Sequence, residues 1–175
     1  MLGCRRARTL DAPCVLVGGL GMGFTLRAAL DLLPPTATVV VSELQPVVVE
    51  WNRGPLGSLA EHPLDDRRVT VDERDVAATL ALSASRFDAV LLDVDNGPDA
   101  FTTSTNARLY GDAGLASIRS ALRPTGDLAV WSAWEDRKFE QRLRYNGFDV
   151  TVERVRARLK QGGPRHTIFM ARRAR

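Results

Sequence analysis

The chain has 175 residues, of which 45% are hydrophobic and 26% charged, and a formal net charge of +3. This length suits one buried core, so we expect a single domain over residues 1–175 with a short N-terminal extension over 1–13. The sequence lacks both the apolar run of about 18–20 residues that a membrane span needs and the apolar block of a secretory signal, which predicts a cytoplasmic protein without membrane contacts.

Short apolar runs alternate with helix-like segments from residue 14 onward. The alternation predicts strands over residues 14–18, 37–42, 68–71, 87–93 and 127–132, and helices over residues 22–33, 45–59, 76–83, 106–122 and 135–145. Proline ends the first helix at Pro34, and a Gly54-Pro55 pair interrupts the second. Such alternation is typical of a parallel sheet that is covered by helices on both faces.

The rhythm changes after residue 147. Residues 149–158 alternate valines with charged side chains, a turn-forming Gln-Gly-Gly-Pro stretch follows, and residues 166–171 form a second apolar run. We interpret this as an antiparallel hairpin. The chain is therefore expected to be an α/β protein with a doubly wound, mostly parallel seven-stranded sheet, rather than a dinucleotide-binding sheet that ends on a sixth parallel strand.

Basic residues gather in the last third of the chain. They are Arg154, Arg156, Arg158, Lys160, Arg165, Arg172, Arg173 and Arg175. Such a face could bind phosphate groups, but alternating arginines on a strand usually form its solvated side, and no aromatic side chains lie between them to stack bases. We therefore expect no nucleic-acid partner.

The segment between the first predicted strand and the first predicted helix is rich in glycine. Its glycines are Gly18, Gly19, Gly21 and Gly23. In open α/β sheets a ligand binds at the carboxyl ends of the strands, where glycines let the backbone turn tightly and approach it. The position of this loop, with an acid about 20 residues further along, favours a nucleoside-binding site.

That acid is Glu43, which follows the second predicted strand. Its carboxylate could accept hydrogen bonds from both ribose hydroxyls of an adenosine ligand, or it could stabilise the start of the next helix. Asp75, after the third strand, could accept the adenine amino group while Leu44 and Val76 cover the ring; an N-cap of the following helix explains Asp75 equally well, and the two roles are compatible.

The fourth predicted strand ends in Asp93, and Asp95 and Asn96 follow. A carboxylate here could orient an attacking amine or accept its proton. The alternative is that Asp93 caps a polar loop. Trp131, Trp134 and Tyr110 could wall an acceptor pocket, with packing in the core as the other interpretation.

Metal and thiol chemistry have little support in the sequence. Neither His62 nor His166 has an acid or cysteine at a metal-like spacing, so we expect no metal. Cys4 and Cys14 form no disulfide framework, and Cys14 fits a small core residue.

Together these segments resemble the spermidine synthase-like (polyamine aminopropyltransferase) branch of the class I S-adenosylmethionine-dependent methyltransferase superfamily. The resemblance spans about residues 14–133 and is carried by VLVGGLGMG, VVVSELQP, VDERDV, FDAVLLDVDNGP and NARLYGDAGLASIRSALRPTGDLAV. It implies the class I methyltransferase fold, a donor that is S-adenosylmethionine or its decarboxylated form, and a small amine-like acceptor. It also implies that the donor is held by the glycine loop with Gly18, Gly19, Gly21 and Gly23, by Glu43 and by Asp75, and that Asp93 is catalytic. Leu44 and Val76 complete the expected donor site, and Asp95 is the second expected catalytic residue, with Asn96 as the other residue that could take that place.

Two departures from this family stand out. The acid that usually lies in the glycine loop, where it meets the cationic tail of the donor, is replaced by Leu20. The β-rich N-terminal domain of the family, often used for oligomerisation, has no counterpart in the dozen residues before the first predicted strand. A homodimer is still a possible assembly. The sequence thus predicts a transferase of methyl or aminopropyl groups, with a nucleoside-binding domain that has lost aminopropyl transfer as the alternative. A nicotinamide-dependent oxidoreductase ranks third, because the hairpin does not fit it.

Overall fold

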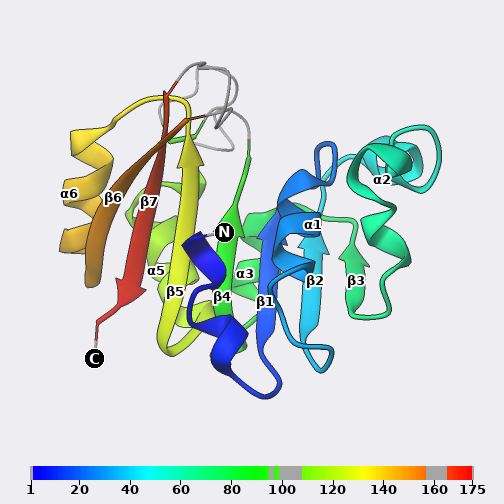
Figure 1. The fold of residues 1–175 in the computed structure, drawn as a ribbon. Helices are drawn as coiled ribbons and strands as arrows, with labels where there is room; N and C mark the ends of the chain where they lie inside the picture. The colour runs from blue at the N-terminus through cyan, green and yellow to red at the C-terminus, as the bar shows by residue number, and fades with distance from the viewer. Residues whose placement is uncertain (1, 95–96, 99–107, 157–164, 175) are drawn as a thin grey trace.

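The structure is a computed structural model that describes residues 2–94, 97–98, 108–156 and 165–174. Its centre is a seven-stranded sheet in the order β3-β2-β1-β4-β5-β7-β6 (Figure 1). The parallel strands are β1 (Cys14–Gly18), β2 (Thr38–Ser42), β3 (Val69–Asp72), β4 (Phe87–Leu92) and β5 (Leu122–Ser132). The strand β7 (Arg165–Arg173) runs antiparallel between β5 and β6 (Phe148–Arg156). The predicted fold class is confirmed, including the C-terminal hairpin.

The helices follow the predicted alternation with the strands. They are α1 (Phe24–Leu30), α2 (Pro46–Arg53), α3 (Val76–Ala81), α5 (Asp112–Ala121) and α6 (Arg137–Tyr145). Short 3₁₀ helices are η1 (Leu2–Cys4), η2 (Ala7–Thr9), η3 (Gly57–Ala60) and η4 (Pro63–Asp65). No helix in the described part of the chain is long and apolar enough to cross a membrane.

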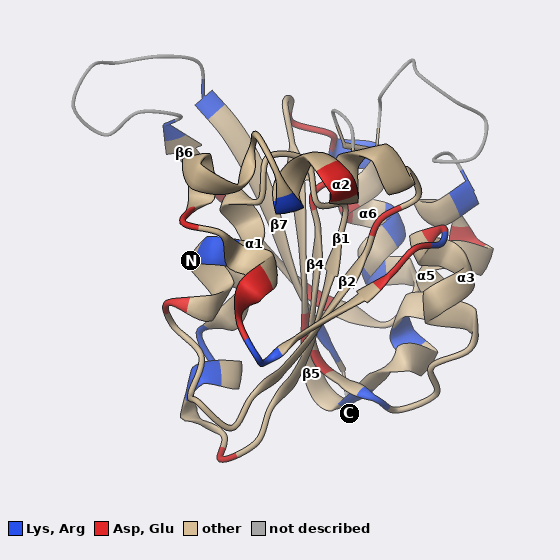
Figure 2. Cartoon of the chain, turned by 90° about the vertical axis from the view of Figure 1, so that its right-hand side faces the viewer, with Lys and Arg blue, Asp and Glu red and all other residues tan. Residues whose placement is uncertain are grey.

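The helices cover the sheet on two sides, as Figure 2 shows with α1 on one side and α3 and α5 on the other. Successive side chains of a strand point to opposite faces, so β1 contributes Leu16 to one core cluster and Val15 and Val17 to the other. The first cluster lies under α3, α5 and α6, and the second lies under α1 and the N-terminal 3₁₀ helices. Burial on both faces explains why the strands are almost continuously apolar.

The register of the strands brings their carboxyl ends to one edge of the sheet. Gly18, the last residue of β1, is the register partner of both Ser42 at the end of β2 and Leu92 at the end of β4. Glu43 and Asp93 come directly after these partners, so they lie on either side of the glycine loop. This is the point where the chain order of the strands reverses, the usual place for a ligand in open α/β sheets.

Several predicted boundaries differ from the structure, and two of these differences have a local cause. The predicted helix over residues 106–122 is broken by a bend at residues 110–111, and α5 begins only after Gly111, whose backbone is extended (φ −78°, ψ 173°). The strand β5 starts at Leu122, earlier than expected, because Leu122 pairs with Phe87 before a register shift in β4. The sequence also predicts a polar loop over residues 97–105, of which only residues 97–98 are described, and the turn of the hairpin lies outside the described residues.

Candidate active site

The glycine loop has a backbone that side chains would not tolerate. Gly19, Gly21 and Gly23 have φ values of 87°, 52° and 81°, in the left-handed region that favours glycine. A Cβ atom on Gly19 would lie 2.6 Å from the backbone oxygen of Asp93. The loop therefore needs glycine both for its conformation and for the close approach of the β4 end. Around Gly21, by contrast, nothing lies within 4 Å of a Cβ position, so this part of the loop faces open space.

Backbone and side-chain hydrogen bonds fix the loop to its neighbours. The N–H of Gly19 donates to the oxygen of Ser42 (2.9 Å), and the N–H of Asp93 donates to the oxygen of Gly18 (3.0 Å). The fully buried Asn52 of α2 donates through Nδ2 to the oxygen of Gly21 (2.8 Å). The sequence alone does not indicate this role of Asn52, because nothing in a single polar residue of an amphipathic helix indicates a partner 31 residues away.

Glu43 lies at the end of β2 with a side chain that is only 8% exposed. Its Oε2 accepts the N–H of Leu20 (2.9 Å), and its Oε1 accepts the N–H of Gln45 (2.9 Å). The carboxylate thus joins the glycine loop to the residue before α2. Each carboxylate oxygen has a second lone pair, so the side chain keeps acceptor capacity for a ligand hydroxyl. Both interpretations of Glu43 from the sequence are compatible with this geometry, and the ribose contact stays a prediction.

Asp75 caps α3, because its Oδ1 accepts the N–H of Ala77 (2.8 Å). The structure therefore confirms its predicted structural role, while its contact with adenine stays a prediction. Val76 is 7% exposed and Leu44 is 56% exposed. An exposed leucine beside the loop after β2 leaves an apolar surface that a flat ring could cover.

A polar network that no sequence pattern indicates holds the segment before Asp75. The hydroxyl of Ser42 donates to the oxygen of Arg74 (2.8 Å) and lies 3.1 Å from the hydroxyl of Thr79. Thr79 in turn donates to Asp72 (2.8 Å), which forms an ion pair with Arg74. These contacts fix the path of the chain from β3 to α3, and with it the place of Asp75.

Asp93 is exposed and accepts a short hydrogen bond from the hydroxyl of Thr25 (2.6 Å). Thr25 belongs to the first turn of α1, so the carboxylate is held on the α1 side of the sheet edge. Asp95, the second predicted catalytic residue, and its neighbour Asn96 lie outside the described residues. The catalytic assignment therefore rests on Asp93 alone, and it stays a prediction.

The structure corrects the expectation for Leu20. Its side chain is 4% exposed and packs in the core cluster under α1, so it does not face the open side of the loop. The exposed positions are Gly21 and Met22. Restoring an acid by Leu20→Asp would bury a carboxylate rather than provide a contact for the tail of a donor.

A cavity of about 470 Å³ adjoins Thr25 on the α1 side of the sheet. Most of its lining residues are apolar, among them Trp131, and the charged ones are Arg5 and Arg8. Trp131 therefore lines a pocket, while the binding of an acceptor there stays a prediction. Tyr110 is 2% exposed and packs edge-on against Phe139, which places it in the core.

The two cysteines are buried or partly buried, and Cys14 lies at the start of β1, away from the glycine loop. Burial raises the pKa of the Cys4 thiol to about 11, and it also raises the pKa of the Cys14 thiol. Both therefore stay protonated near neutral pH. Within the described ranges no three residues of the types His, Cys, Asp and Glu gather in a way that could hold a metal ion.

Comparisons with known proteins identify the fold. No family model matches the sequence, and a search of curated proteins gives no significant match. Among solved structures, a spermidine synthase from Thermotoga maritima is 19% identical, with a TM-score of 0.71 over 96% of this chain and 56% of its own. A spermidine synthase in complex with the transition-state analogue AdoDATO is 18% identical, with a TM-score of 0.70 over 96% of this chain and 55% of its own.

A methyltransferase of known structure is also similar to this chain. Human methyltransferase-like protein 13, solved in complex with SAH, is 19% identical, with a TM-score of 0.66 over 95% of this chain and 74% of its own. The chain thus spans slightly more than half the length of the two spermidine synthases. At these identities the comparisons establish the fold, which is the Rossmann-like fold that class I methyltransferases and spermidine synthases share.

Proposed function

We propose that the chain is a transferase that binds S-adenosylmethionine at the carboxyl ends of β1, β2 and β4 and moves a group from its sulfonium to an amine-like acceptor. The observation that carries this proposal is the direct linkage of the three predicted ligand elements. Glu43 accepts the N–H of Leu20 in the glycine loop, and Asp93 donates its own N–H to Gly18. A site whose parts are connected in this way is preorganised for one ligand across the edge of the sheet.

The lining of the cavity that adjoins Thr25 favours S-adenosylmethionine over its decarboxylated form. The decarboxylated donor ends in a bare ammonium group, whereas S-adenosylmethionine ends in an ammonium and a carboxylate. The charged residues that line the cavity beside Thr25 are Arg5 and Arg8, whereas the carboxylate of Asp93, which accepts a hydrogen bond from Thr25, is not part of its lining. Because arginines attract a carboxylate and repel an ammonium, we propose that a methyl group rather than an aminopropyl group is transferred.

The reaction needs positioning more than charge stabilisation. The lone pair of the acceptor nitrogen attacks the methyl carbon, the carbon–sulfur bond breaks, and its electrons stay on the sulfur. The positive charge moves from the sulfonium to the acceptor nitrogen, which then loses a proton. We assign Asp93 the orientation of the acceptor and the acceptance of this proton, because its carboxylate is exposed and its second oxygen has no protein donor among the described residues.

The test is turnover of native protein and of Asp93→Asn, with S-adenosylmethionine or its decarboxylated form as donor and a panel of small amines as acceptors. The release of S-adenosylhomocysteine or methylthioadenosine reports methyl or aminopropyl transfer, respectively. Asp93→Asn should lower turnover by roughly 10² to 10⁴, the usual contribution of a positioned acid or base, and leave donor affinity nearly unchanged. Asp31→Asn, which removes an exposed carboxylate at the other end of α1, is the matched control.

The alternative function is a nucleoside-binding domain without catalysis. The hydrogen bond from Thr25 to Asp93 fits that function as well, since it also holds a loop in place. Donor binding without turnover for any amine would favour the alternative. Loss of donor binding in a folded Asp93→Asn variant would instead make Asp93 a ligand anchor and refute its catalytic role.

A further inference from the structure

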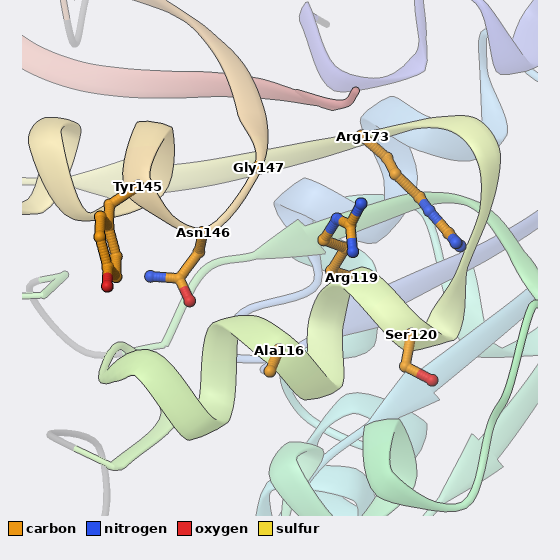
Figure 3. Close-up of a pocket in the computed structure, with 7 residues that line it drawn as sticks. All are labelled: Ala116, Arg119, Ser120, Tyr145, Asn146, Gly147 and Arg173. Atoms are coloured by element: carbon orange, nitrogen blue, oxygen red, sulfur yellow. The ribbon is translucent and has the colours of Figure 1, made fainter. Parts of the chain in front are cut away.

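A second pocket lies at the opposite edge of the sheet from the candidate active site. It has a volume of about 550 Å³ and is formed by α5, by the residues between α6 and β6, and by the end of β7. The parallel strand β5 begins beside it, at Leu122, and ends at Ser132 on the other edge. The residues that line it are drawn in Figure 3: Ala116, Arg119, Ser120, Tyr145, Asn146, Gly147 and Arg173.

Two arginines that have no acidic partner among the described residues line this pocket. Within the described part of the chain, neither Arg119 nor Arg173 forms an ion pair, and the Nε of Arg119 is buried without a hydrogen bond. Arg173 donates through Nη1 to the oxygen of Leu122 (2.5 Å) and keeps its other donors free of described partners. Among the described residues, Asp112 accepts a hydrogen bond from the lining residue Asn146.

Such a pair of guanidinium groups has a preference for one kind of ligand. Two positive charges in one pocket repel each other, and an anion bound between them adds two attractive interactions that offset this repulsion. The planar fork of donors on each guanidinium matches the oxygens of a phosphate group, and the hydroxyl of Ser120 adds a further donor. The Nε–H of Arg119 is buried without an acceptor, so a hydrogen bond to such a ligand would stabilise the complex most at this group.

The other end of the pocket offers a flat apolar surface. Tyr145 is 87% exposed, and Figure 3 shows it on the far side of the pocket from the arginine side chains. A large exposed ring next to a cationic pocket is a surface on which a base can stack. The volume of about 550 Å³ lies within the range of small-molecule sites, roughly 300–1,000 Å³.

We propose that this pocket binds a phosphorylated ligand of nucleotide size, with its phosphate between Arg119 and Arg173 and its base against Tyr145. The site is separate from the donor site and does not depend on the proposed transferase activity. It differs from the expected solvated strand face, because the arginines that form it come from α5 and the end of β7 and converge on one cavity.

The test is calorimetric titration of the native protein with pyrophosphate, uridine monophosphate and uridine, in the presence of saturating S-adenosylhomocysteine to occupy the donor site. Pyrophosphate and uridine monophosphate should bind with dissociation constants below about 1 mM, more weakly at high salt, and uridine should not bind measurably. Arg119→Gln and Arg173→Gln should each weaken binding about tenfold or more. Arg137→Gln, an exposed arginine of α6 outside the pocket, should leave it unchanged.

A second measurement keeps the test independent of variants that fold poorly. In nitrogen–proton correlation spectra of the native protein, pyrophosphate should shift the Nε–H signal of Arg119 and the amide signals of Ser120 and Gly147. Tyr145→Ala should weaken the binding of uridine monophosphate without affecting the binding of pyrophosphate. Absence of these shifts at millimolar pyrophosphate, or equal losses in Arg137→Gln and the two pocket variants, would overturn the proposal.

Discussion

The hydrogen bonds of Glu43 predict that this residue stabilises the empty protein as well as any complex. Replacing it with alanine leaves the N–H groups of Leu20 and Gln45 without their acceptor. The bond to Leu20 is buried, whereas the bond to Gln45 is only partly buried, so water can replace the second more easily. A hydrogen bond to a charged group contributes about 1.5–3 kcal/mol, so Glu43→Ala should lower the free energy of unfolding by about 2–4 kcal/mol.

Urea unfolding followed by circular dichroism measures this change without any ligand. Glu43→Gln keeps one acceptor oxygen but turns an amide donor toward one of the two N–H groups, so it should recover no more than about half of the loss. Glu50→Ala, an exposed glutamate of α2, should stay within about 0.5 kcal/mol of the native protein. A Glu43→Ala protein as stable as the Glu50→Ala protein would refute the structural role of this carboxylate.

Three further predictions follow from local geometry. Asp75→Ala removes the N-cap of α3 and should lower the free energy of unfolding by about 1 kcal/mol in the same urea assay. Gly19→Ala should lower it by more than about 2 kcal/mol, because its Cβ would meet a backbone oxygen at 2.6 Å and its φ is 87°. The ion pair with Arg68 lowers the pKa of Asp66 from 3.8 to about 2. The ion pair therefore stabilises the folded protein above about pH 4, and this stabilisation is lost as the pH falls through about 2. When the free energy of unfolding is measured against pH, Arg68→Gln should lose less stability over this range than the native protein.

Each of these has a control on a neighbouring residue. Gly21→Ala has a similar left-handed strain but no atom within 4 Å of its Cβ, so it should be milder than Gly19→Ala. Glu73→Ala is the control for Asp75→Ala, because Glu73 is an exposed acid two residues earlier that is not the N-cap of α3. Arg67→Gln removes an exposed charge next to Arg68 and should keep the acid-dependent loss. Equal effects in a variant and its control would contradict the corresponding prediction.

The architecture could be predicted from the sequence because it depends on local patterns. Apolar runs bounded by proline and glycine give the strands, and the alternation of these runs with amphipathic segments gives the parallel sheet. The rule that ligands bind beyond the carboxyl ends of strands then points to Glu43 and Asp93 without any coordinates. The N-cap position of Asp75 follows from the same kind of local reasoning.

Contacts between distant segments could not be predicted in this way. Asn52 holds the glycine loop from α2, and Thr25 holds Asp93 from α1, yet neither residue stands out in its own helix. Leu20 shows the same limit: its place in the loop suggested a contact with the ligand, but the turn of the backbone directs its side chain into the core. The alternation of apolar and helix-like segments also does not show where β5 begins. Its first residue, Leu122, pairs with Phe87 ahead of a register shift, and the sequence does not indicate that shift.

The measurement that tests the central claim most directly is parallel calorimetric titration of the native protein with S-adenosylmethionine, its decarboxylated form, methylthioadenosine and NAD. We predict one site for S-adenosylmethionine with a dissociation constant below about 100 μM, and no comparable binding of NAD. In Glu43→Ala the affinity for S-adenosylmethionine should fall by about tenfold or more, even where the variant is folded. Tighter binding of NAD, or no binding of any adenosine compound, would contradict the assignment of this edge of the sheet as a site for a sulfonium donor.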